Sequence, residues 1–316
     1  MSDLDLLYMP ATELAPAIRE GTISPVEVME AVLARIEALQ PRLNAFITIT
    51  AEAARAAAQE AARAVADSGG NGLGPLHGVP FSVKDLTFTK GVRTTMGSHI
   101  HADFVPSEDA VPVARLKQAG AILIGKTTTP EYGNGPITMA PLFGQTANPW
   151  HTDFTPGGSS GGAATAVATG MGPLALGTDG GGSVRIPASC CGLVGLKATL
   201  GAVPHIQAPD LFGSNSYIGP LTRTVADARL VFDIIAGPHD GDPYALAVPP
   251  EFPTLPAPDL KGVRIGWLPR AGNKHIDKEV LAATEKTTRL LEGMGAAVEI
   301  IEFDFVAEEP MFLTLM

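Results

Sequence analysis

The sequence predicts an α/β fold in which helices cover a mixed or parallel central β-sheet. Two observations support this fold class. Short apolar runs typical of buried strands alternate along the chain with longer amphipathic or alanine-rich stretches typical of helices, and such alternation characterises sheets covered by helices. In addition, 45% of the 316 residues are apolar, which is enough for a sizeable core.

The first half of the chain contains the clearest helix signal. Ser24-Pro25-Val26-Glu27 is a capping box with proline at the first helical position, and apolar residues continue at helical spacing to Ile36. Further elements are expected as follows: a helix over 51–66, a loop over 68–74, a strand over 79–86 that carries Lys84, a helix that Asp109 caps and Gly120 ends, and a strand over 121–124.

The second half continues the alternation, with no internal repeat. Residues 238–260, rich in proline and aspartate, are expected to form a surface excursion. The expected elements are a helix of small residues over 163–170, a strand over 174–176, a helix over 224–236, a strand over 263–268, a helix over 277–292 and a strand over 297–303.

Charge and cysteine content argue against several classes of protein. The formal net charge is −11 without a long basic run, so nucleic acid and anionic membranes are not expected as main partners. The only cysteines, Cys190 and Cys191, are adjacent, which rarely suits a disulfide and indicates a reducing compartment. The acidic N-terminus is unlike a signal peptide, and no apolar window reaches the length of a membrane span. We therefore expect a soluble, cytoplasmic protein.

Two dense glycine clusters, GGSSGG at 157–162 and GGGS at 180–183, each deliver a serine. Glycine loses the most conformational entropy on folding, so such clusters need a physical reason. Consecutive backbone amides can point at an anion only where no side chain blocks the approach. Ser159 is expected at the head of a helix and Ser183 after a strand, so the fold can bring the two hydroxyls together.

The chain resembles the amidase signature family over about residues 24–237. GGSSGG followed by GTDGGGSVRIPASCCGLVGLK is similar to that family's serine- and glycine-rich signature, and GVPFSVKD at 78–85 is similar to its lysine motif. AGAILIGKT at 119–127, NPW at 148–150 and GPLTR at 219–223 match further family motifs in the same order. Ala198, where the family usually has proline, is a departure that concerns a turn.

The resemblance implies a catalytic arrangement without histidine. A serine nucleophile needs a base, and a lysine can serve if burial lowers its pKa from about 10.4 toward neutrality. Asp179 and Arg185 either brace the nucleophile's loop or form a purely structural ion pair. The implied roles are Lys84 as base, Ser159 as bridge with a cis peptide bond, Ser183 as nucleophile, and the backbone amides of Gly180, Gly181, Gly182 and Ser183 as oxyanion hole.

The implied activity is hydrolysis of amide carbon–nitrogen bonds through an acyl-enzyme, with no cofactor and no metal. The expected substrate is a small-molecule amide, anilide or carbamate; aryl ester cleavage is chemically reachable by the same route, and a homodimer stays open. One alternative is the glutaminase-type subunit of a tRNA-dependent amidotransferase. That subunit usually has threonine and glutamine where this chain has Gly180 and Ile186, which weakens this interpretation.

Residues 1–316 are expected to form a single amidase signature domain. Family members are longer, so we expect the sheet to be completed by segments beyond Met316. The alternative, if the protein ends at Met316, is an inactive or partner subunit.

Loops outside the signature are expected to shape the substrate pocket, although their apolar residues suit a core equally well. The candidate pocket residues are Tyr132, Ile137, Leu142, Phe143, Leu211 and Phe212.

Three other motifs point to different chemistry but lack the expected context. Residues 120–127 match a P-loop, yet a helix precedes them and the middle residues are strand-like, so Lys126 is expected to be structural. Residues 157–161 match a nucleophile elbow, but a polar, proline-ended stretch precedes them instead of a strand. That interpretation would need His205, His239 or His275 as base. His99 and His101 with Asp103 are weak metal-ligand candidates, because no other histidine clusters nearby in sequence.

Overall fold

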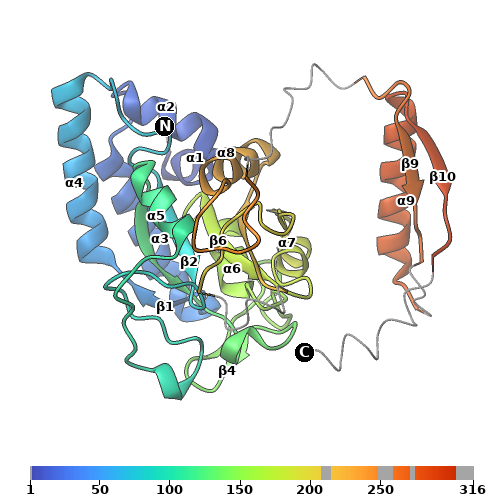
Figure 1. The fold of residues 1–316 in the computed structure, drawn as a ribbon, viewed down its shortest axis with the longest axis horizontal. Helices are drawn as coiled ribbons and strands as arrows, with labels where there is room; N and C mark the ends of the chain where they lie inside the picture. The colour runs from blue at the N-terminus through green and yellow to red at the C-terminus, as the bar shows by residue number, and fades with distance from the viewer. Residues whose placement is uncertain (1, 208–214, 248–258, 271–274, 304–316) are drawn as a thin grey trace. The chain divides into compact units, whose positions relative to one another are not determined.

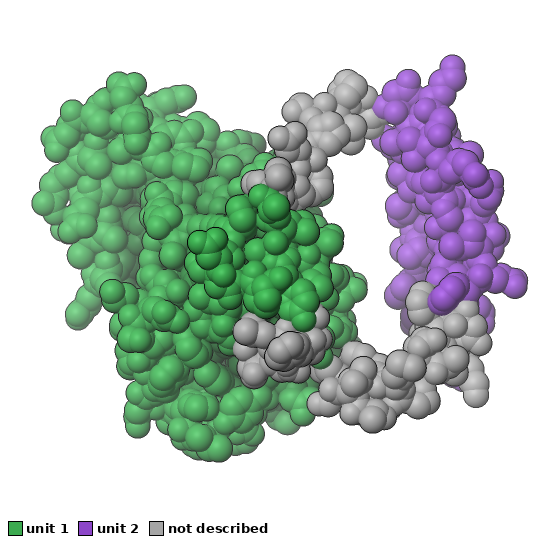
Figure 2. Space-filling view, viewed as in Figure 1, with its two compact units in different colours: residues 1–250 green, residues 251–316 purple. Residues whose placement is uncertain are grey.

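A six-stranded mixed sheet forms the centre of the first part of the chain (Figure 1). The computed structural model describes residues 2–207, 215–247, 259–270 and 275–303. It divides into two compact units, Met1–Pro250 and Glu251–Met316, which Figure 2 colours separately. That the whole chain forms a single domain stays a prediction.

The sheet combines parallel and antiparallel strands, as the sequence predicted. The three central strands β3, β2 and β6 are parallel, and β1, β8 and β7 add antiparallel strands outside them. In spatial order the strands are β1 (Phe46–Ile49), β3 (Ile122–Thr127), β2 (Pro80–Lys84), β6 (Leu174–Asp179), β8 (Tyr217–Thr222) and β7 (Val194–Gly195).

Helices and short turns connect the strands of the first unit. Ser24 caps α3 through the amide of Val26, and Asn44 ends it in the left-handed conformation. The helices are α1 (Asp3–Tyr8), α2 (Ala11–Arg19), α3 (Pro25–Leu43), α4 (Ala51–Ser68), α5 (Val111–Gln118), α6 (Gly161–Ala168), α7 (Arg185–Cys191) and α8 (Val225–Ile235). Single 3-10 turns lie at His99–His101 (η1) and Glu131–Gly133 (η2), and β4 (Met139–Ala140) pairs with β5 (Gly144–Gln145).

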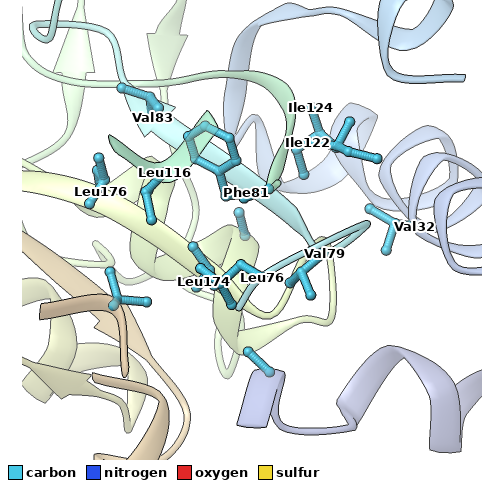
Figure 3. Close-up of a cluster of buried hydrophobic side chains, with 14 of the residues drawn as sticks. Val32, Leu76, Val79, Phe81, Val83, Leu116, Ile122, Ile124, Leu174 and Leu176 are labelled. Atoms are coloured by element: carbon cyan, nitrogen blue, oxygen red, sulfur yellow. The ribbon is translucent and has the colours of Figure 1, made fainter. Parts of the chain in front are cut away.

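Alternating side chains give the sheet two apolar faces. Phe81, Val83, Leu174 and Leu176 belong to the larger cluster, which Figure 3 shows with Ile122, Ile124 and Leu116. Ala175 belongs instead to a second cluster with residues of α6 and α7. In parallel pairing Val83 lies opposite Lys126, and Lys84 lies opposite Thr127. Because neighbouring residues of a strand point to opposite faces, Lys84 and Lys126 leave the sheet on opposite sides.

One predicted helix start was wrong. Ala110, not Asp109, is the N-cap of α5, and it makes no side-chain cap bond. The Asp109 carboxylate instead accepts hydrogen bonds from the Lys90 amide and from Lys117 Nζ, at 2.8 Å each. An ammonium on the following helix is a stronger partner for this carboxylate than an amide of the first turn.

The second unit is a separate strand–helix–strand element. Strands β9 (Arg264–Trp267) and β10 (Ala297–Ile300) pair in parallel, and α9 (Lys278–Gly293) connects them, as parallel pairing requires. Asp277 caps α9 through the amides of Glu279 and Val280, and the helix itself lies where the sequence predicted one. Both strands are slightly shorter than expected.

Among the residues described, no helix is both long and apolar enough to cross a lipid bilayer.

Candidate active site

Lys84 is the last residue of β2, and its side chain is fully buried. Its Nζ atom lies 2.6 Å from Ser159 Oγ, 2.9 Å from Thr178 Oγ1 and 3.4 Å from the Thr178 carbonyl oxygen. Thr178 belongs to β6, which pairs directly with β2. The sheet therefore brings together a lysine and a threonine that are 94 positions apart.

Burial sets the charge of Lys84. Removal from water disfavours the ammonium and lowers the pKa of Lys84 well below its ordinary value, although the charge of Asp179 opposes the shift. No other described residue hydrogen-bonds to the Ser159 hydroxyl. A neutral Lys84 can therefore accept the hydrogen of this hydroxyl at 2.6 Å.

Ser159 follows a glycine that allows two backbone segments to approach closely. The Gly158–Ser159 peptide bond is cis, as the resemblance implied. A Cβ on Gly158 would lie 2.7 Å from the carbonyl carbon of Pro136, so only glycine allows this approach. Ser160 follows as N-cap of α6, and its amide donates to the Ser183 carbonyl oxygen at 3.1 Å. The two serine clusters are thus joined by a backbone hydrogen bond.

Ser183 lies on the loop between β6 and α7, and Asp179 holds this loop in shape. The fully buried Asp179 carboxylate accepts hydrogen bonds from the amides of Gly182 at 2.8 Å and Val184 at 3.1 Å. Gly182 has φ +115°, which favours glycine. The Ser183 side chain itself is half-buried.

Arg185 completes this carboxylate site. Its Nε and Nη2 atoms donate to the two Asp179 oxygens at 3.0 and 2.8 Å, while half of the arginine side chain stays exposed. Burial alone would raise the pKa of Asp179, but the bonds from Arg185 and the two amides outweigh it and lower the pKa to about 2. The ion pair therefore does more than link two side chains, because the same carboxylate also fixes the loop amides.

The η2 turn lies against Ser159 on another side. A Cβ on Gly133 would lie 3.4 Å from Ser159 Oγ and 2.6 Å from Leu86 Cδ1. Tyr132, one residue earlier, has φ +52° and is half exposed. Tyr132 was a candidate pocket residue, but the approach of Gly133 to Ser159 was not predicted, because a glycine has no side chain that would mark it as a contact.

The predicted pocket residues are distributed unevenly. Tyr132 precedes Gly133 in the chain, and the backbone of Ile137 lies against Gly158. Both residues are 49% exposed. Leu142 and Phe143 lie in the turn between β4 and β5, where the Phe143 carbonyl accepts a bond from Asn44. Leu211 and Phe212 lie outside the described residues. The pocket as a whole stays a prediction.

A second buried lysine lies on the neighbouring strand β3. Lys126 is fully buried and donates to the Thr87 carbonyl at 2.5 Å, to Thr89 Oγ1 at 3.0 Å and to Thr94 Oγ1 at 2.8 Å. Burial lowers the pKa of Lys126 to about 7, and the charges of Asp85 and Asp109 oppose this shift. The P-loop-like stretch is thus strand β3 with a buried lysine.

Asp85, which follows Lys84, is also fully buried. Its Oδ2 accepts bonds from the amide and the hydroxyl of Thr95, and its Oδ1 has no partner among the described residues. Burial raises the pKa of Asp85, against the charge of Lys126.

The remaining motifs do not converge on a second site. Residues 146–158, all described, contain no strand before Ser159 as an elbow would need. The His205 ring binds the Ser216 carbonyl through Nδ1 at 3.2 Å. The His101 ring packs edge-on against Phe104 and Tyr132. Within the described ranges, no group of three or more His, Cys, Asp or Glu side chains is arranged to hold a metal ion; a reaction without metal stays a prediction.

Comparison with known proteins identifies the family. The family model described as Amidase matches residues 27–315. An acylamidase from Rhodococcus erythropolis is 43% identical over 299 residues, which cover 94% of this chain and 62% of that protein. A glutamyl-tRNA(Gln) amidotransferase subunit from Geotalea daltonii is 41% identical over 294 residues, which cover 93% of this chain and 60% of that protein.

A solved structure agrees with the sequence comparison. The structure of a bacterial aryl acylamidase of the amidase signature enzymes matches with a TM-score of 0.87 and 35% identity, covering 93% of this chain and 61% of that one. The chain thus spans less than two thirds of the length of these relatives. With most of its residues inside the family model and with relatives at over 40% identity, this chain belongs to the amidase signature family.

Proposed function

We propose that this protein hydrolyses small-molecule amides through an acyl-enzyme, with Ser183 as nucleophile, Ser159 as bridge and Lys84 as base. The observation that carries the proposal is the 2.6 Å contact between a fully buried lysine and the Ser159 hydroxyl. A lysine whose charge is disfavoured by burial is suited to take a proton, and a hydroxyl in contact with it is suited to pass one on.

The first half-reaction forms the acyl-enzyme. Lys84 takes the Ser159 proton while Ser159 takes the proton of Ser183, and Ser183 Oγ bonds to the carbonyl carbon of the substrate. The carbonyl oxygen becomes an oxyanion. The carbon–nitrogen bond then breaks as the proton returns from Lys84 through Ser159 to the leaving nitrogen, which departs as a free amine.

The second half-reaction repeats these steps with water. Water gives its proton through Ser159 to Lys84 and attacks the acyl ester, and the proton returns to Ser183 as the carboxylic acid leaves. The sequence-based assignment gave the oxyanion to the amides of residues 180–183. Because the Gly182 amide already donates to Asp179 at 2.8 Å, we assign the oxyanion to the amides of Gly180, Gly181 and Ser183, on a loop that Asp179 fixes through the amides of Gly182 and Val184.

Anilides and other aryl amides are the favoured substrates. The Rhodococcus relative is named an acylamidase and the matched solved structure is that of an aryl acylamidase. Tyr132 precedes Gly133, which lies against Ser159; its ring packs edge-on against His101 and is exposed, and we assign it as an apolar surface for an aryl group. Carbamates and aryl esters follow the same chemistry. We expect the reaction to need no metal or other cofactor and to take place in the cytoplasm.

The alternative function is that of a glutaminase subunit in a tRNA-dependent amidotransferase. Several relatives with about the same identity carry the name of such an amidotransferase subunit, the Geotalea protein among them. Gly180 and Ile186 depart from the residues usual in that subunit, so we rank this function second. Release of ammonia from glutamine, together with a need for partner subunits, would favour it.

A hydrolysis screen of the purified protein tests the proposal. The panel contains an acetanilide, an aliphatic amide, an aryl carbamate, an aryl ester and glutamine, each measured for the wild type and for Ser183→Ala. We expect turnover of the anilide that Ser183→Ala abolishes. Glutamine turnover alone would replace the proposal by the alternative, and turnover of no substrate by a folded protein would favour an inactive or partner subunit.

A further inference from the structure

Lys126 does not contact Ser159, Ser160 or Ser183, yet its nitrogen makes three hydrogen bonds, as that of Lys84 does. Its three partners, Thr87, Thr89 and Thr94, all lie on the loop over residues 85–98 that follows β2. The Thr89 hydroxyl also donates to the Thr87 carbonyl, and the Thr94 hydroxyl donates to the Val92 carbonyl. Because each hydroxyl already donates its only hydrogen to a carbonyl, it can only accept a hydrogen bond from Lys126. An ammonium has three hydrogens and satisfies all three acceptors.

One end of this loop reaches the η2 turn through a side chain. The Thr87 amide donates to the Lys84 carbonyl at 3.0 Å, and its own carbonyl binds Lys126. Leu86 lies between Lys84 and Thr87 in the chain. Its side chain packs against Gly133, which also faces Ser159 Oγ. A shift of Thr87 would therefore move Leu86 and loosen the turn that borders Ser159.

The other end reaches the same turn through the backbone. Thr94 precedes Thr95, which binds the Asp85 carboxylate by its amide and hydroxyl. Met96 then donates its amide to the Asp85 carbonyl at 3.1 Å, and its carbonyl accepts the Tyr132 amide at 2.8 Å. Met96 and Tyr132 both have positive φ, at +55° and +52°. Non-glycine residues keep such conformations only where the surroundings hold them, and they gather at functional sites.

We propose that Lys126 is a positioning residue of the active site: its ammonium fixes the loop over residues 85–98, and this loop holds Tyr132 and Gly133 in place against Ser159. The inference rests on the proposed function, since it assigns a second lysine to the same site. Lys126 takes no part in proton transfer. It sets the position of the η2 turn, where Gly133 lies against the bridging serine.

The test compares Lys126→Met with Lys90→Met as the matched control. In Lys126→Met the methionine keeps the length of the buried side chain and removes the three donors. Lys90 is a lysine of the same loop; its backbone amide binds Asp109 and is kept in the variant, and its exposed side chain makes no hydrogen bond or ion pair with a described residue. Thr94→Val removes one acceptor only and serves as the milder variant should Lys126→Met fail to fold. All measurements are made well below each melting temperature.

Two readouts are independent of overall stability. We expect hydrogen exchange of the Tyr132, Gly133 and Asn134 amides to become faster in Lys126→Met and, to a smaller extent, in Thr94→Val. We also expect kcat for the anilide to fall on the order of 10- to 100-fold in Lys126→Met, as for a small misplacement of a catalytic group. The midpoint of the pH profile should stay unchanged, because Lys84 keeps its own surroundings. Lys90→Met should match the wild type in all three.

A double-mutant cycle with Gly133→Ala tests the route. The added methyl would lie 3.4 Å from Ser159 Oγ and would push against Leu86, so it displaces the turn directly. If Lys126 acts through this turn, the double variant should lose little more kcat than the worse single variant, whereas independent effects would multiply. Multiplying effects would overturn the proposal.

Failure of this inference and failure of the proposed function have different results. A wild type that hydrolyses anilide, together with Lys126→Met that keeps wild-type kcat and wild-type exchange at residues 132–134, would overturn the inference alone, whatever the melting temperature. A wild type without amide turnover, in which Lys126→Met still accelerates exchange at these residues, would overturn the proposed function and leave the positioning of the turn standing.

Discussion

Lys84 and Lys126 lie on neighbouring parallel strands, and both side chains are fully buried, yet their nitrogen atoms have different kinds of partners. Around Lys126 every partner oxygen can only accept a hydrogen bond, which requires the ammonium. Around Lys84 the Ser159 hydroxyl has a hydrogen to give and no other described partner. Two equally buried lysines therefore differ in their partners: those of Lys126 favour its ammonium, whereas Ser159 can donate to a neutral Lys84.

Charges in the surroundings act in the same direction as the hydrogen bonds. Asp85 and Asp109 oppose the loss of charge at Lys126, whose pKa is lowered by burial to about 7. Asp179 alone opposes it at Lys84, and that carboxylate is itself engaged by Arg185 and two loop amides. Burial alone therefore does not distinguish the proposed base from the proposed positioning lysine, whereas the hydrogen-bond partners of the two nitrogens do differ.

The largest expected difference between the two lysines is in catalysis. Lys84→Ala should lower kcat for an anilide on the order of 10³-fold or more, because it removes the base while leaving the oxyanion amides in place. The kcat of this variant for an aryl ester should fall less, since a phenolate departs without a proton whereas an amine needs one. Steady-state kinetics on a matched anilide and ester checks this. Equal losses on both substrates would contradict the role of Lys84 in protonating the leaving group.

A smaller effect on kcat is expected from a change at Asp179, the residue whose charge raises the pKa of Lys84. Asp179→Asn should lower kcat on the order of 10²-fold, because the loop that carries the oxyanion amides loses its charged anchor. The carboxylate also favours the ammonium of Lys84, so its removal should lower the pKa of Lys84 further. The acid limb of the pH profile should then move to lower pH. A limb that moves to higher pH would mean that Lys84 does not carry it.

The smallest expected effect concerns stability in acid. The folded-state pKa of Asp179 is about 2, below the ordinary value for aspartate, so the carboxylate stabilises the fold above the unfolded-state pKa. This contribution is lost as the pH falls through about 2. Urea unfolding should show the wild type more stable than Asp179→Asn at pH 5, with a difference that shrinks toward pH 2. A difference independent of pH would show that the charge is not its source.

The sequence predicted the candidate site residues better than the contacts that hold them in place. Ser159, Ser183 and Lys84 were expected from glycine clusters and a lysine motif, and the mixed sheet from the alternation of elements. Thr178 was missed as a partner of Lys84, because nothing in the sequence reveals strand register across 94 positions. Lys126 was expected to be structural because its motif lacked the context of a P-loop, and its partners were missed because threonines of a loop resemble any polar turn. Asp109 was assigned a cap that an ion pair displaced.

The central claim is that Lys84 activates Ser183 through Ser159. The most direct measurement is the rate at which a fluorophosphonate labels the protein as a function of pH, with the labelled residue identified by peptide mapping. The account predicts label on Ser183, a rate that rises with pH to an alkaline plateau as Lys84 loses its proton, and loss of both rate and pH dependence in Lys84→Ala. Label on Ser159, or an unchanged rate and pH profile in Lys84→Ala, would contradict it.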